Sequence, residues 1–160
     1  MIGILSDSHD NMPKLEWAVR FFNNAGCDLV IHAGDFVAPF AAAVLAGLRA
    51  PVKAVFGNCD GEKAGLAAAI APFGEVREAP FRFEHRGLRF LLVHSNARLD
   101  DLIAAAAPDV AVFGHTHKFE VGRRGKTLIV NPGEAGGWVH GNCTAALLDP
   151  ASLAVDIVPL

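Results

Sequence analysis

Cysteine is scarce in this sequence, and positive charge is not in excess. The 160 residues include three cysteines, far apart at positions 27, 59 and 143, without a C-x-x-C pair. This spacing argues against a disulfide framework or a zinc knuckle, and it favours a reducing compartment such as the cytoplasm. The net charge of −3 gives no general basic field, so we do not expect nucleic acid as a bulk partner.

Long apolar runs are also missing. No uninterrupted stretch approaches the roughly 20 apolar residues of a membrane span. Met1–Leu5 is followed at once by Asp7 and His9, with no basic segment and no cleavage site, so we expect a first strand rather than a signal peptide. The sequence shows no repeat, linker or low-complexity tract. With 52% apolar and 19% charged residues, it predicts one domain, residues 1–160, with a substantial core.

Alternating apolar runs and helical patterns predict an α/β fold whose second half is more antiparallel. In the first half we expect a helix between the N-cap Asn11 and Gly26, and further elements as follows: strands at 2–5, 28–31 and 52–56, and helices at about 39–48 and 62–71. After Gly74 the pattern predicts a hairpin of 81–85 with 88–93, a helix at 99–107, and strands at 109–113, about 118–122, 127–130, 143–149 and 153–158.

Polar residues with ligand atoms follow five of the apolar runs. Gly114-His115-Thr116-His117 comes directly after Val110–Phe113, and the other runs end in Asp7 and His9, Asp35, Asn58 and Asp60, and His94. Each residue alone has an ordinary explanation, since Asp7 and Asp35 could be helix N-caps and Asn58 could lie in a turn. In open α/β sheets, however, ligands gather just outside the carboxyl ends of the strands. Neutral imidazoles and carboxylates together there favour a metal site.

These motifs resemble the signature of the calcineurin-like metallophosphoesterase superfamily. The matching elements, in chain order, are Asp7-x-His9, Gly34-Asp35, Gly57-Asn58-x-Asp60, His94 and Gly114-His115-x-His117, with Asn131-Pro132-Gly133 as a further one. Length and motif spacing are most similar to the small single-domain phosphodiesterases of bacteria and archaea. The resemblance implies a four-layer α/β/β/α sandwich, in which two mixed β-sheets are flanked by helices.

The resemblance also implies two divalent metal ions. One would be held by Asp7, His9, Asp35 and His117, and the other by Asp35, Asn58, His94 and His115, with Asp35 shared. In the family, a hydroxide between the ions attacks phosphorus, and the ions offset charge on the phosphoryl oxygens. Manganese is the family-like expectation. Iron, cobalt, nickel and zinc also suit a donor set without thiolate, and magnesium suits it less well.

The implied activity is hydrolysis of a small phosphate ester, a phosphodiester in preference to a monoester or a nucleotide. Asp35, Asn58, Asp60, Cys59 and His94 are the expected catalytic residues. Cys59 stands where some branches have a histidine that serves as general acid. The rival prediction from another class is a non-catalytic interaction scaffold, since a retromer coat subunit has this fold. No membrane partner is expected, and Trp17, roughly opposite the core stripe of its helix, could mark a homo-oligomer contact or pack under a loop.

The remaining histidines receive lesser roles. His32 is expected in the core or behind the ligands, His140 is a weak candidate for substrate contact, and His85 has no expected role. Asn131-Pro132-Gly133-Glu134 is expected to place backbone near the metals, and many relatives have Ser where this sequence has Glu134.

Overall fold

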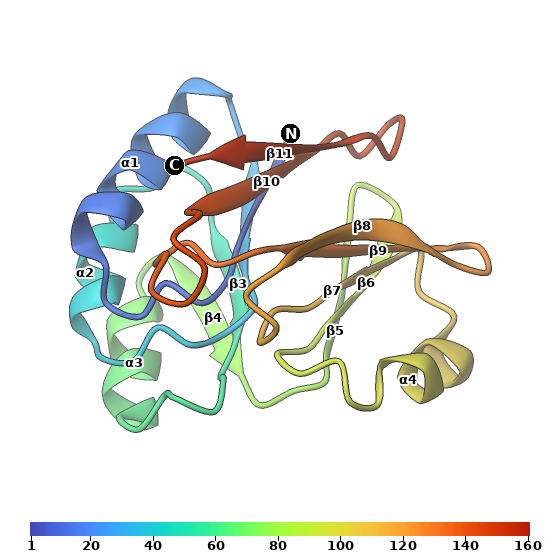
Figure 1. Cartoon of the computed structure of the whole chain (residues 1–160), viewed down its shortest axis with the longest axis horizontal. Helices are drawn as coiled ribbons and strands as arrows, with labels where there is room; N and C mark the ends of the chain where they lie inside the picture. Colours follow the sequence, from blue (N-terminus) through green and yellow to red (C-terminus); the bar gives the residue numbers. More distant parts are fainter.

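Two mixed β-sheets pack face to face, and helices cover their outer faces (Figure 1). The structure, a computed structural model, describes residues 1–160. The strands are β1 (Ile2–Leu5), β2 (Leu29–His32), β3 (Val52–Val55), β4 (Gly74–Arg77), β5 (Phe81–His85), β6 (Leu88–Leu92), β7 (Val110–Val112), β8 (Phe119–Arg124), β9 (Thr127–Pro132), β10 (Thr144–Leu148) and β11 (Val155–Pro159). The helices are α1 (Met12–Asn24), α2 (Phe40–Leu45), α3 (Lys63–Ile70) and α4 (Leu99–Ala106). The predicted α/β/β/α sandwich is confirmed.

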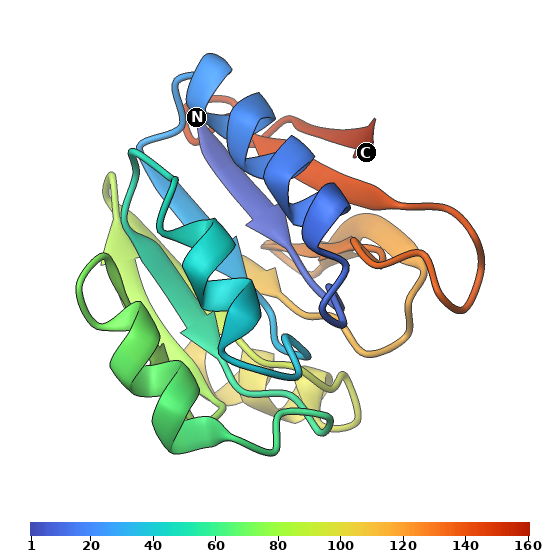
Figure 2. The same cartoon turned by 90° about the vertical axis from the view of Figure 1, so that its left-hand side faces the viewer.

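The six-stranded sheet has the order β11-β10-β1-β2-β3-β4, and the five-stranded sheet has the order β5-β6-β7-β9-β8. Strands β1 to β4 run parallel, as do β6, β7 and β9 in the other sheet, and antiparallel strands complete both sheets. Figure 2 shows α1, α2 and α3 lying side by side over the six-stranded sheet. Chemistry in such sheets concentrates at the carboxyl ends of the parallel strands.

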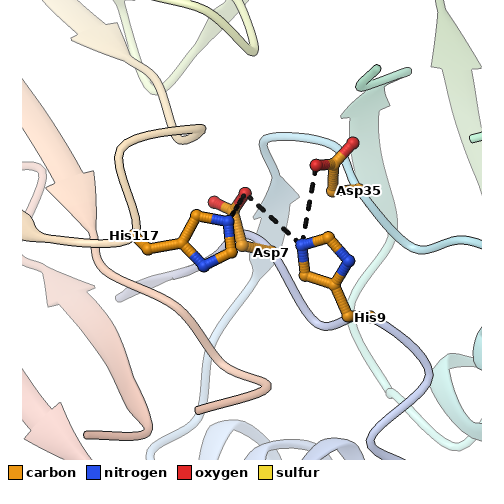
Figure 3. A group of neighbouring side chains, drawn as sticks. All are labelled: Asp7, His9, Asp35 and His117. Carbon is orange, nitrogen blue, oxygen red and sulfur yellow. Dashed lines mark ion pairs between the residues drawn. The ribbon is translucent and has the colours of Figure 1, made fainter. Parts of the chain in front are cut away.

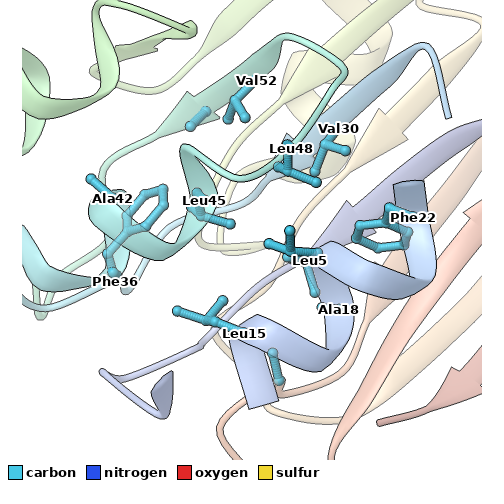
Figure 4. Close-up of a cluster of buried hydrophobic side chains, with 14 of the residues drawn as sticks. Leu5, Leu15, Ala18, Phe22, Val30, Phe36, Ala42, Leu45, Leu48 and Val52 are labelled. Carbon is cyan, nitrogen blue, oxygen red and sulfur yellow. The ribbon is translucent and has the colours of Figure 1, made fainter. Parts of the chain in front are cut away.

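Three apolar clusters hold the four layers together. Leu5 and Val30 pack with Leu15 and Phe22 between the six-stranded sheet and its helices (Figure 4). Ile4 faces the other way, into the cluster between the two sheets, because successive residues of a strand point to opposite faces. A third cluster joins α4 to the outer face of the five-stranded sheet. Strands covered on both faces explain the continuous apolar runs in the sequence.

Some predicted elements differ in extent. Helix α2 covers Phe40–Leu45 rather than 39–48, and the chain beyond it turns through the exposed Gly47, a poor helix former. Strand β4 is missing from the prediction because its Gly-Glu-Val-Arg sequence has one large apolar residue, and it forms at the sheet edge by pairing with β3. Asn11 caps α1 as predicted, accepting a hydrogen bond from the Lys14 backbone N–H.

Two further features bear on interactions. Trp17 is half-buried and stacks on Phe21, with 5.2 Å between the ring centroids, so a homo-oligomer contact there stays a prediction. None of the four helices is long and apolar enough to cross a membrane.

Candidate metal centre

The seven predicted ligand residues all lie in loops that follow parallel strands. Asp7 and His9 come after β1, and the others come from the loops after β2, β3, β6 and β7: Asp35, Asn58, His94, His115 and His117. The two sheets bring these loops to one edge of the sandwich. The structure therefore assembles the set in one place, in two groups that meet at Asp35.

The first group consists of Asp7, His9, Asp35 and His117, whose ligand atoms all lie within 4.8 Å of one another (Figure 3). His117 Nε2 is 3.4 Å from Asp7 Oδ1, and His9 Nε2 is 3.6 Å from Asp35 Oδ2. Asp7 Oδ1 and His9 Nε2 are buried and have no hydrogen-bond partner. A buried polar atom without a partner costs about 1–3 kcal/mol, and a cation among these four side chains would remove that cost. The residues therefore fit a metal ion.

The second group is built around the Asn58 side chain. Asn58 Oδ1 is 2.9 Å from His94 Nε2 and 2.9 Å from His115 Nδ1. His94 Nδ1 lies 2.7 Å from the Ala33 carbonyl oxygen, which only accepts, so Nδ1 carries the proton. His94 Nε2 then lies near Asn58 Oδ1 and, at 3.4 Å, Asp35 Oδ2: protonated, it donates to Asp35, and in the neutral form its lone pair would be free for a metal ion. A carboxylate oxygen, an amide oxygen and an imidazole nitrogen that converge in this way also fit a cation, which would bind the neutral form of His94.

The pKa values of the two buried carboxylates are shifted in opposite directions. Burial raises the pKa of Asp7, and its hydrogen bonds and neighbouring imidazoles do not fully offset this effect. Burial acts in the same direction on Asp35, but hydrogen bonds from His94 and from the Cys59 backbone N–H outweigh it and hold the pKa of Asp35 below its ordinary value. Asp35 is therefore ionised at neutral pH even without a metal ion, and a cation would favour the ionised form of Asp7 as well.

Five ligand residues have a left-handed backbone. The φ angles are 53° at Asp7, 41° at His9, 59° at Asp35, 67° at His115 and 60° at His117. Residues other than glycine adopt this region at a cost, and such conformations persist where the surrounding structure imposes them, often at functional sites. The backbone strain is therefore found at five of the seven candidate metal ligands.

Two glycines allow the loops to approach closely. A Cβ atom at Gly57 would lie 2.1 Å from Asp35 Oδ1, and one at Gly114 would lie 1.8 Å from the Ser6 hydroxyl oxygen. Any side chain at either position would displace Asp35 or the start of the β1 loop. Close packing thus explains why glycine precedes the candidate ligands Asn58 and His115 in the sequence.

Asp60 does not face the ligand cluster. Its buried carboxylate accepts hydrogen bonds from the backbone N–H groups of Asp35 (3.1 Å), Val37 (2.7 Å) and Gly57 (2.8 Å). The bond to Val37 holds a β-branched residue at a φ of 88°. These contacts give Asp60 a positioning role for the loops after β2 and β3.

Cys59 is exposed beside the cluster. Its backbone N–H donates to Asp35 Oδ1 at 2.8 Å, and its thiol sulfur lies 3.3 Å from Asn58 Nδ2. Partial burial, and then the neighbouring Asp35 carboxylate, raise the pKa of the Cys59 thiol. The thiol therefore stays protonated at neutral pH.

The sequence did not reveal the role of the Glu134 side chain. Glu134 is fully buried, and its carboxylate accepts hydrogen bonds from His117 Nδ1 (2.9 Å) and from the backbone N–H groups of Val139 (3.0 Å) and His140 (2.6 Å). Burial opposes its ionisation, but these donors prevail and lower the pKa of Glu134. A carboxylate on one imidazole nitrogen fixes the tautomer and leaves the other nitrogen free for a metal. The one sequence feature that could have indicated this role is an acidic residue among the small residues of 133–137.

The other histidines lie outside the two groups. His32 is fully buried, accepts a hydrogen bond from the Gly34 N–H and stacks on Phe36, and burial lowers its pKa to about 3. This placement agrees with the expected core position. His140 is exposed and lines a cavity of about 450 Å³ beside His117, whereas His85 faces Asp28 at 3.4 Å, outside the cluster.

The alternative explanations for the acidic residues are wrong. Asn11 is the N-cap of α1 and Pro39 that of α2, so neither Asp7 nor Asp35 caps these helices. Asp7 Oδ2 instead accepts a hydrogen bond from the His115 backbone N–H at 3.0 Å, which ties the loops of the two sheets together.

Known proteins share both the sequence pattern and the fold. Residues 1–152 match the calcineurin-like phosphoesterase superfamily domain. Phosphodiesterase MJ0936 of Methanocaldococcus jannaschii is 34% identical over 152 residues, which cover 92% of each chain. A solved archaeal phosphodiesterase superposes with a TM-score of 0.94 at 31% identity, and the match covers 99% of both chains. The E. coli phosphoesterase YfcE, at 21% identity, has a TM-score of 0.69 over 98% of this chain and 97% of its own. The chain belongs to the calcineurin-like phosphoesterase superfamily and is a hydrolase of phosphate esters.

Proposed function

We propose that this protein is a phosphodiesterase that works with two divalent metal ions. The observation that carries the proposal is the pair of ligand groups that share Asp35, whose Oδ2 lies 3.6 Å from His9 Nε2 and 3.4 Å from His94 Nε2. A single carboxylate oxygen that faces nitrogens of both ligand groups suits a shared ligand. The phosphodiesterase at 34% identity supports the preference for diesters.

Each ion would have its own set of side chains. Asp7, His9, Asp35 and His117 would hold one ion, and Asp35, Asn58, His94 and His115 the other. Divalent ions bound there would supply positive charge for the phosphoryl oxygens and would lower the pKa of a water molecule. Manganese suits the mixture of carboxylate, imidazole and amide. Three free cysteines suit a reducing compartment, and we propose the cytoplasm.

The chain's own residues would orient these ligands and the ester. Ala33 and Glu134 fix the free nitrogens of His94 and His117 by accepting the other ring proton. In the reaction, water adds to phosphorus, the bond to one ester oxygen breaks, and that oxygen leaves with a proton. The protonated Cys59 thiol lies beside Asn58 and is the candidate donor of that proton.

Metal removal and reconstitution test the proposal. The protein is stripped with a chelator, and bound metal, melting temperature and hydrolysis of bis(p-nitrophenyl) phosphate and p-nitrophenyl phosphate are measured before and after Mn²⁺ is returned. We expect two ions per chain, a higher melting temperature with metal, and diester hydrolysis that disappears on chelation and returns with Mn²⁺. A metal-free protein with full activity would refute the metal requirement. Faster monoester hydrolysis would refute the preference for diesters.

A further inference from the structure

An apolar groove begins at the second ligand group. It has a volume of about 600 Å³, and Asn58, His94 and His115 line it. This size lies within the roughly 300–1,000 Å³ that is usual for small-molecule sites. A phosphoryl group held at the second ligand group would therefore lie at the end of the groove.

The walls of the groove come from three separate segments. Phe56 follows β3, Ala79 and Pro80 join β4 to β5, and Ala97 and Leu102 belong to the start of α4 and the turn before it. Figure 1 shows α4 beyond the five-stranded sheet, on the side opposite α1, α2 and α3. Among the charged amino acids Asp, Glu, Lys and Arg, one lines the groove: Arg98, which is largely exposed and lies 3.8 Å from Asp101.

The cavity on the other side of the ligand cluster is different in character. It is lined by His117 of the first group together with Lys118, His140, Asn142 and Thr144, and Phe119 is its one apolar residue. The two sides of the cluster therefore offer different surroundings to the two substituents of a phosphodiester. A charged or hydroxyl-rich substituent suits the polar cavity, because burial of such groups against apolar walls costs free energy.

We propose that the apolar groove binds one ester substituent of the substrate, and that this substituent is an uncharged aromatic ring. The inference rests on the proposed function, because the groove is a substrate site only if the phosphoryl group lies at the ligand cluster. A flat ring gains from contact with Phe56, Pro80 and Leu102. The ring itself carries no polar group that would need a hydrogen-bond partner in the groove. The groove thus selects the substrate through a part of the molecule that does not react.

Direct binding of two unreactive anions tests the groove. Methyl methylphosphonate and methyl phenylphosphonate carry the same single negative charge and differ in one substituent, a methyl or a phenyl group. Their Kd values for the Mn²⁺-loaded protein are measured by titration calorimetry. We expect the phenyl compound to bind roughly 10–200-fold more tightly, the range that an apolar pocket provides for a small apolar group.

Two variants fill the groove from different segments of its wall. Ala97→Trp and Ala79→Trp place a large side chain at exposed positions, so neither disturbs the core. Each should bring the ratio of the two Kd values close to one, while the Kd of the methyl compound changes by less than about twofold. Ala105→Trp, at an exposed position of α4 outside the groove, is the matched control and should keep the wild-type ratio.

The outcomes separate this inference from the proposed function. A Kd ratio near one in the wild type, or a wild-type Kd ratio in both tryptophan variants, would refute binding of the ring in the groove even if the protein hydrolyses diesters. Absence of phenyl binding in a protein that hydrolyses diesters would do the same. Absence of both anion binding and diester hydrolysis in the Mn²⁺-loaded protein would overturn the proposed function together with the groove.

Discussion

Replacement of Glu134 by glutamine should weaken one metal site and leave the other intact. The Glu134 carboxylate accepts three hydrogen bonds, from His117 Nδ1 and from the backbone N–H groups of Val139 and His140. An amide has one oxygen and one NH2 group. If the NH2 group replaces Oε1 it faces the His140 N–H, and if it replaces Oε2 it faces both His117 and the Val139 N–H. Either orientation opposes a donor to a donor.

The expected magnitude follows from these contacts. Loss of the carboxylate partner of a metal-binding imidazole typically costs about 10–100-fold in metal affinity. Because His117 belongs to the first ligand group only, that loss should fall on one of the two ions. In the metal-free protein, a buried donor without an acceptor should lower the free energy of unfolding by about 1–3 kcal/mol.

Titration calorimetry with Mn²⁺ and urea unfolding of the metal-free protein measure the two effects. Glu62→Gln is the matched control, because Glu62 is exposed and its side chain makes no capping hydrogen bond to α3. If the affinity for both ions fell equally, Glu134 would act through the general stability of the fold. Unchanged affinity for both ions would show that the His117 contact does not influence metal binding.

Three further substitutions test the site. Asp35→Asn should lower kcat/KM for diesters by more than about 100-fold, because loss of even a residue that only hydrogen-bonds to a metal ligand lowers metal affinity or activity by about 10–100-fold. A smaller decrease in kcat/KM would contradict the shared role of Asp35. His32 in the unfolded chain takes up a proton near pH 6.5, the ordinary pKa of histidine, whereas burial lowers its folded pKa to about 3. The metal-free protein should therefore lose stability as pH falls through that window, by at most about 1.4 kcal/mol per pH unit, and in urea titrations His32→Gln should flatten that slope. Cys59→His should reduce the dependence of kcat/KM on leaving-group pKa, since imidazole is a better acid for a departing alkoxide than a thiol, and identical slopes would exclude proton donation from position 59.

The fold was predictable wherever burial leaves a pattern in the sequence. Strands β2 and β7 contact apolar layers on both faces and were visible as continuous apolar runs. Strand β4 was missed because its one large apolar residue, Val76, leaves no periodicity over four residues, and its extended form depends on pairing with β3. Pairing between distant segments has no local signal of this kind.

The candidate site was predictable in its residue types but not in its supports. Polar residues after apolar strands are visible in any α/β sequence, and the structure brings all seven ligand candidates together. The contact between Glu134 and His117 depends on how closely the loop after β9 approaches the loop after β7. The left-handed angles at Asp7 and His9 likewise follow from backbone hydrogen bonds to the neighbouring loop at Gly34 and Asp35. Neither feature leaves a mark on local composition.

A reciprocal pair of hydrogen bonds explains how Asp35 presents one oxygen to both ligand groups. The Asp60 carboxylate accepts the backbone N–H of Asp35, and the Asp35 carboxylate accepts the backbone N–H of Cys59 through Oδ1. The loops after β2 and β3 thereby fix each other, and the absence of a side chain at Gly57 lets them meet. With Oδ1 engaged by the backbone, Oδ2 is the atom that faces His9 and His94. A catalytic role for Asp60 stays a prediction, and its contacts with the backbone N–H groups of Asp35, Val37 and Gly57 hold the loop of the shared ligand in place.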